Sequence, residues 1–94
     1  MSIPTLEHEM KDELGLYYYP APQHPEARMY VRRFAGRVEF RMWHRDDASV
    51  WEKHQWLPYA VIEQAAAMFK AGGKKADPAS LYDLAVAERL LAEE

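Results

Sequence analysis

Six of the twelve Lys and Arg side chains of this 94-residue chain lie in one short segment, 28–45, where they alternate with aromatic and aliphatic residues. The segment has a single acidic residue and a net charge of +5, whereas the parts before and after it each carry −4. Guanidinium groups bind carboxylates and phosphates through paired hydrogen bonds, and exposed rings can stack on bases. The pattern predicts a binding surface made of these residues: Arg28, Tyr30, Arg32, Arg37, Arg41, Trp43 and Arg45.

The charge distribution favours an acidic protein surface as the partner of this segment. Nucleic-acid-binding domains are usually basic throughout, and the whole chain has a net charge of −3. Binding of single-stranded nucleic acid on the same face is the alternative. The arginines could also serve the fold alone, through a cross-strand ion pair between Arg32 and Glu39 and through cation–π pairs. If they form a binding surface, we expect the fold to survive their replacement.

A second group of residues could support metal binding or acid–base catalysis: His44, Asp46, Asp47, Glu52 and His54. Imidazole and carboxylate groups are ligands for divalent metals and can transfer protons. However, the spacing of the two histidines fits no motif of known geometry. No glycine-rich loop follows a predicted strand, and neither serine of the body lies in a nucleophile elbow. We therefore expect a non-catalytic interaction protein without metal or cofactor, and keep a small enzyme at the His44–His54 corner as a further alternative.

The length and composition predict one domain, residues 1–94, in a reducing compartment. Apolar residues make up 49% of the chain and charged residues 29%, which is typical of globular domains. There is no cysteine and therefore no disulfide. The apolar runs are far shorter than the roughly 20 residues of a membrane span. We expect a soluble, cytoplasmic protein with no membrane partner.

Residues 28–44 predict a β-hairpin, because polar and apolar residues alternate along them. A two-residue loop, Ala35-Gly36, places residue 33 opposite 38, 31 opposite 40 and 29 opposite 42. This register gathers one apolar face: Met29, Val31, Val38, Phe40 and Met42. A three-residue loop, 34–36, suits the turn residues better, because alanine is strained in a two-residue loop. It sorts polar from apolar less well, so we favour the first register.

The remaining segments predict short helices, and the fold class is α+β, an antiparallel hairpin packed on two to four helices. Apolar spacing predicts helices at 5–14, 58–71 and 78–93, and Ser49 with Glu52 forms a capping box for a short helix at 49–56. Three prolines make 17–25 an extended connector, whose tyrosines can supply a third strand. An exposed sheet edge could also pair with a second copy in a homodimer. The expected core is Val38, Phe40, Ile62, Ala65, Phe69, Leu81 and Leu84.

Overall fold

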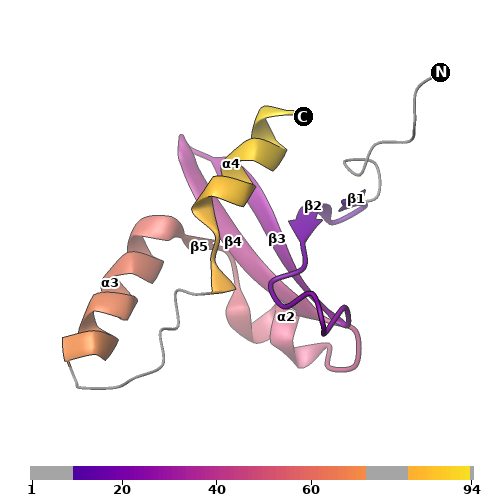
Figure 1. Cartoon of the computed structure of the whole chain (residues 1–94), viewed down its shortest axis with the longest axis horizontal. Helices are drawn as coiled ribbons and strands as arrows, with labels where there is room; N and C mark the ends of the chain where they lie inside the picture. Colours follow the sequence, from indigo (N-terminus) through magenta and orange to yellow (C-terminus); the bar gives the residue numbers. More distant parts are fainter. Residues whose placement is uncertain (1–9, 72–80, 94) are drawn as a thin grey trace.

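The computed structural model describes residues 10–71 and 81–93. They form a five-stranded antiparallel sheet in the order β1-β2-β3-β4-β5, packed with three helices (Figure 1). The predicted α+β class is thereby confirmed. The strands are β1 (Lys11–Asp12), β2 (Gly15–Tyr18), β3 (Ala27–Phe34), β4 (Arg37–His44) and β5 (Leu57–Pro58). The helices are α2 (Ser49–His54), α3 (Tyr59–Ala71) and α4 (Leu84–Ala92). No described helix is long and apolar enough to cross a membrane.

The central hairpin has the register that we favoured from the sequence. Val31 lies opposite Phe40, and Met29 lies opposite Met42. Ala35 and Gly36 form the two-residue loop with φ values of 53° and 77°. Both values lie in the left-handed region, as a primed hairpin turn requires. Ala35 therefore adopts a backbone conformation that is strained for a residue with a Cβ atom.

The predicted helix at 5–14 is wrong for its described part, and residues 5–9 lie outside the described residues. Instead, Lys11 and Asp12 pair with Leu16 and Gly15 in a tight hairpin. The Leu14 N–H donates to Asp12 Oδ1 (2.8 Å), and Gly15 has a φ of 126°. A side-chain acceptor and a glycine in the left-handed region favour a turn over a helix here. The expected third strand is present as β2.

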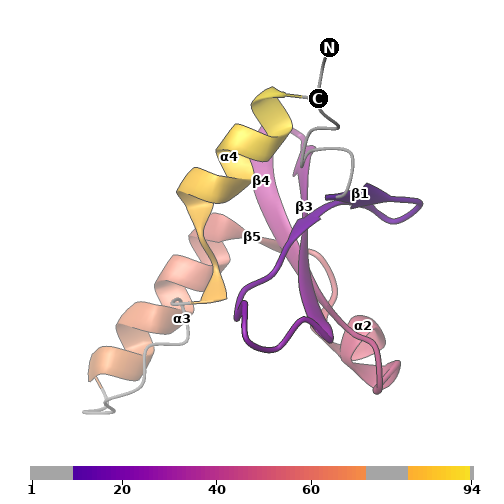
Figure 2. The ribbon, with the colours of Figure 1, turned by 45° about the vertical axis from the view of Figure 1, so that its right-hand side comes forward.

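The core lies between one face of the sheet and the helices α3 and α4, which Figure 2 shows on the same side of the hairpin. Phe40 is fully buried, and Val38 and Ile62 are buried with it, as predicted. Leu84 packs against this cluster, whereas Leu81 is 38% exposed. In α3, Ala66 is buried in place of the exposed Ala65. The side chain of Phe69 lies outside the described residues. The buried cluster comprises Leu16, Tyr18, Met29, Val31, Val38, Phe40, Ile62 and Ala87.

The short helix α2 ends at His54, two residues before the predicted end. Gln55 has a φ of 61°, and the next residues form β5, with Leu57 opposite Phe40. The predicted capping box is wrong: Ser49 lies inside the helix, and its N–H and hydroxyl both donate to Asp47 Oδ1. The Asp47 carboxylate thus accepts from the Ser49 N–H, which the Glu52 side chain was expected to reach in the capping box.

The two longer helices differ in how well the sequence predicts their starts. α3 begins at Tyr59, directly after Pro58, and confirms the helix predicted at 58–71. α4 begins at Leu84, so the prediction of a helix from residue 78 is wrong for Tyr82 and Asp83. Asp83 has extended backbone geometry, and its side chain accepts from the Val86 N–H (3.1 Å), which makes it the N-cap. The proposed cap at Asp77 lies outside the described residues.

Candidate functional site

The arginine-bearing face of the hairpin is covered over much of its length. α2 packs on this side, opposite α3 and α4 (Figure 2). Tyr30 is fully buried, and its ring meets Tyr17 and Trp51 with centroid separations of 5.2 and 5.5 Å. The sheet therefore buries aromatic side chains on both faces. Tyr30, predicted to lie on a binding surface, cannot contact a partner directly and instead supports its neighbours.

Arg28 is held inside this covered part by rings and by hydrogen bonds. Its guanidinium lies 4.5 Å from the Tyr17 ring centroid and 4.8 Å from that of Trp43. One amino group donates to Asp12 Oδ2 (3.0 Å) and to the Tyr30 hydroxyl (3.3 Å). The hydrogen bond to Tyr30 raises the pKa of Arg28, and burial raises the pKa of Tyr30 to about 12. Arg28, on β3, thus connects its own strand to three others: β1 through Asp12, β2 through Tyr17 and β4 through Trp43. The sequence had placed Asp12 in a helix.

Arg41 attaches α2 to the sheet. Its Nε and Nη2 donate to the Trp51 carbonyl oxygen at 2.9 and 2.7 Å, and its guanidinium lies 4.0 Å from the Trp51 ring centroid. Tyr30 lies opposite Arg41, as the register predicts, but the ring on which the guanidinium stacks belongs to Trp51. Both contacts are internal, so Arg41 serves the fold.

The end of the hairpin, residues 32–37, which we name the hairpin tip, is where cations remain accessible. Arg32 donates from Nε to Glu39 Oε1 (2.7 Å), and its guanidinium lies between the rings of Phe34 (4.5 Å) and Trp56 (4.4 Å). Phe34 is 54% exposed. Arg33 and Arg37 are exposed, and neither side chain has an ion pair or hydrogen bond with a described residue.

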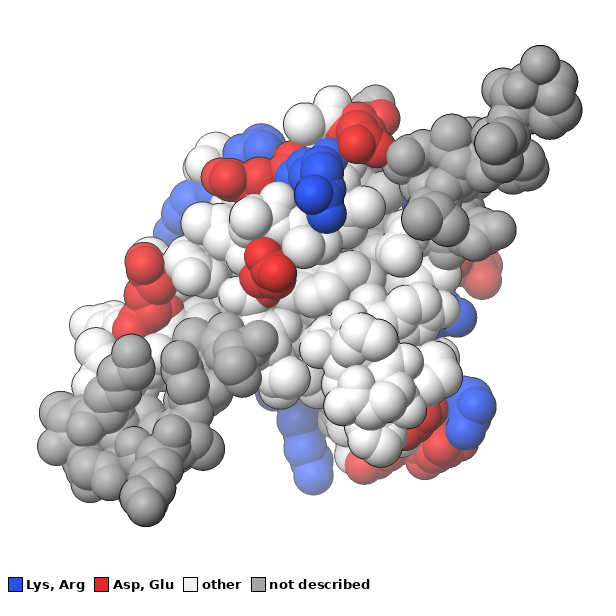
Figure 3. Space-filling view, viewed as in Figure 1, with Lys and Arg blue, Asp and Glu red and all other residues white. Residues whose placement is uncertain are grey.

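Figure 3 places cationic side chains at the upper left, over the β3–β4 turn. Arg33 was not among the predicted binding residues, because its position alternates with theirs and points to the opposite face. Near a turn both faces are open to solvent, and this proximity is the signal that could have identified it.

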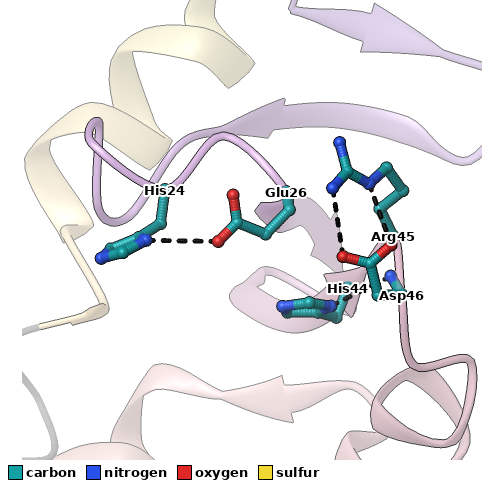
Figure 4. A network of polar contacts seen from close by, with 5 residues as sticks. All are labelled: His24, Glu26, His44, Arg45 and Asp46. Carbon is teal, nitrogen blue, oxygen red and sulfur yellow. Dashed lines mark hydrogen bonds and ion pairs between the residues drawn. The ribbon is translucent and has the colours of Figure 1, made fainter.

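Arg45 lies at the opposite end of the hairpin, in a separate polar network (Figure 4). It forms two hydrogen bonds with the carboxylate of Asp46, both 3.1 Å long, which lower the pKa of Asp46 and raise that of Arg45. The Arg45 N–H donates to the Glu26 carbonyl (2.8 Å) and brings the loop before β3 beside the end of β4. His24 Nδ1 lies 3.2 Å from a carboxylate oxygen of Glu26. The predicted seven-residue surface is therefore divided between two ends and a covered middle.

The two histidines of the proposed metal or acid–base corner have different partners. His44 Nδ1 accepts from the Asp46 N–H (3.1 Å). His54 Nδ1 lies 2.7 Å from the Gln55 carbonyl oxygen, which can only accept, so this nitrogen carries a hydrogen. His54 Nε2 lies 2.7 Å from the Tyr82 hydroxyl oxygen and is hydrogen-bonded to it. Within residues 10–71 and 81–93, no group of three or more His, Cys, Asp or Glu side chains is placed to hold a metal ion.

The chain matches no protein-family model, no curated protein and no solved structure. The evidence on function therefore comes from its own side chains.

Proposed function

We propose that this protein is a non-catalytic interaction module that binds an acidic surface of a partner protein through its hairpin tip. The observation that carries the proposal is the pair of exposed arginines, Arg33 and Arg37, which flank the half-exposed ring of Phe34 and have no side-chain partner among the described residues. Arginine and aromatic side chains dominate the energetics of protein interfaces. An unpaired guanidinium on a rigid hairpin can form bidentate bonds to a carboxylate without first breaking an internal ion pair.

The arginines differ in whether their guanidinium groups already have partners within the fold, and this difference supports the tip as the binding surface. Arg28 and Arg41 are half-buried and hydrogen-bonded, so a partner would gain little from them and their removal would disturb the sheet. Arg32 is paired with an internal carboxylate and stacks on two rings, and its side chain is 38% exposed. The tip therefore combines preorganised and unpaired cations, which lowers the ordering cost of binding.

An acidic protein suits the tip better than a nucleic acid does. The segments on either side of 28–45 each carry −4, and this charge would repel an extended phosphate backbone that runs beyond the tip. A compact cluster of carboxylates on a protein needs only the tip itself. A catalytic role at His44 and His54 has less support, because the two imidazoles are bonded to separate partners.

The proposal is tested by affinity capture from a lysate of the source organism. Arg37→Glu reverses one charge at the tip. We expect the amount of partner recovered with this variant to be at least tenfold lower than with the wild-type protein. Arg45→Glu makes the same change just beyond the other end of the same strand, β4, and Arg89→Glu makes it on α4. Both controls should keep wild-type recovery, because neither residue belongs to the tip.

The controls separate the other hypotheses. Loss of the partner after nuclease treatment would point to nucleic acid, and equal losses in Arg37→Glu and Arg45→Glu would assign binding to the whole segment 28–45. Sedimentation velocity of the wild-type protein alone distinguishes a second copy of the chain from a different acidic protein. Equal recovery by Arg37→Glu and wild type would refute the proposal.

A further inference from the structure

The third strand leaves the hairpin before β3 ends. β2 pairs with β3 only at Leu16–Tyr18, opposite Val31, Tyr30 and Met29. Before Leu16 the chain turns into the hairpin with β1, and β3 continues to Phe34 with no described strand on this side. Among the described strands, the last residues of β3 thus have one neighbour, β4, and one open edge.

The register shows which backbone groups point to that edge. In a hairpin closed by a two-residue loop, the flanking residues Phe34 and Arg37 bond to each other, and every second residue of β3 then faces β4. The residues in between, Met29, Val31 and Arg33, face the other way. The first two meet β2, whereas the N–H and C=O of Arg33 point to the open edge.

A recess of about 520 Å³ lies at this edge. Its lining includes Val31, Arg33 and Leu91, which belong to the core side of the sheet, and also Arg32 and Trp56, which belong to the side of α2. Because residues from both faces of the sheet line the recess, it lies along the edge of β3, where an additional strand would pair. The β1–β2 turn, residues 13–14, forms part of its wall, and Glu13 is the one carboxylate among the described residues of that wall.

We infer that this recess accepts an extended acidic segment of the partner protein, which adds to the open edge of β3 as a short strand beside Arg33. The inference rests on the proposed function and specifies how the partner is held. Strand addition takes its affinity from backbone hydrogen bonds and its specificity from alternate side chains. The exposed guanidiniums of Arg33 and Arg37 select carboxylates toward the tip, and the Trp56 ring and Leu91 offer apolar contact. Glu13 repels an acidic residue at the turn, so the carboxylates must lie away from it.

The test uses a blocked synthetic hexapeptide of alternating glutamate and valine, with wild-type protein and two variants. Arg33→Ala keeps the backbone N–H and removes the charge, whereas Arg33→Pro removes both. Proline is tolerated at this position because the N–H of residue 33 does not bond to β4. We expect Arg33→Pro to bind the peptide about two- to tenfold more weakly than Arg33→Ala, the range for one backbone hydrogen bond. Methylation of the peptide nitrogens that face β3 should weaken wild-type binding by a similar factor.

The outcomes separate this inference from the proposed function. If Arg37→Glu loses binding but Arg33→Pro and the methylated peptide behave like their controls, strand addition is refuted and the tip remains the binding surface. If the peptide does not bind the wild-type protein, or binds Arg37→Glu equally well, both proposals fail. Should Arg33→Pro not fold, amide exchange in the wild-type protein decides: the peptide must slow exchange of the Arg33 N–H, and unchanged exchange overturns strand addition.

Discussion

Replacing Arg41 with alanine should destabilise the protein far more than the same change at Arg37. Arg41 donates two hydrogen bonds to the Trp51 carbonyl and stacks on the Trp51 ring at 4.0 Å. Hydrogen bonds from a charged donor contribute about 1.5–3 kcal/mol, and the two share one acceptor, so we count them once. The cation–π contact adds roughly 0.5–2 kcal/mol. We therefore expect Arg41→Ala to lower the free energy of unfolding by roughly 2–5 kcal/mol.

Urea denaturation followed by tryptophan fluorescence measures this loss. With an m-value of about 1–3 kcal/mol/M, the midpoint of Arg41→Ala should fall by at least about 0.7 M. Arg37→Ala is the matched control: it lies on the same strand, is exposed, and should change stability by less than ~0.5 kcal/mol. Equal midpoints for the two variants would refute the assignment of Arg41 to the fold. The sequence-based expectation that the arginines can be replaced at little cost therefore applies to Arg37 and not to Arg41.

Three further predictions concern the core, the turn and the tyrosines. Phe40→Ala should cost roughly 3–5 kcal/mol, because the ring is fully buried; an unchanged urea midpoint would contradict the core assignment. Ala35→Asn should raise stability by roughly 0.5–1 kcal/mol, because asparagine tolerates the left-handed backbone of this turn; a lower melting temperature would contradict it. Burial raises the pKa values of Tyr18 and Tyr30 to about 12 from 10.0, so their contribution to stability is complete below pH 10 and is lost as the pH rises toward 12. Unfolding curves across this range should show the loss, Tyr18→Phe should reduce it, and a flat profile would count against these shifts.

The hairpin could be predicted from the sequence because its information is local. Alternation of polar and apolar residues along 28–44 selects one register, since a shift by one residue would expose the whole apolar face. A third strand from the tyrosines of 17–25 was one option that the sequence offered, and β2 forms it earlier along the chain, at Gly15–Tyr18. The helix at 58–71 followed from proline at its start and a continuous apolar pattern.

Two parts of the fold depend on contacts that the local pattern does not contain. The face with Tyr30 looks polar in sequence, but β2 and α2 bring Tyr17 and Trp51 over it and convert its middle into a second packed layer. In α3, the run of alanines carries little information about which side faces the core, so the buried position moves from Ala65 to Ala66. Both errors arise where packing between distant segments decides the burial.

The same limitation shaped the prediction of the candidate site. Alternation along a strand identified the arginine-bearing face, but which arginines stay accessible depends on where α2 docks and where β2 ends. Arg41 is occupied because Trp51 lies against it, and Arg33 is accessible because the neighbouring strand has turned away. Neither fact can be obtained from residue types and spacing within 28–45.

The most direct measurement of the central claim is the map of backbone amide shifts when the alternating glutamate–valine hexapeptide is added to the ¹⁵N-labelled protein. We expect the largest shifts to fall within residues 32–37, to saturate together with one affinity, and to be absent in Arg37→Glu. The amides of Arg45 and Asp46 should be unchanged, because an internal ion pair satisfies the Arg45 guanidinium. Shifts centred on residues 43–46, or shifts of equal size at charged residues over the whole protein surface, would contradict a binding site at the hairpin tip.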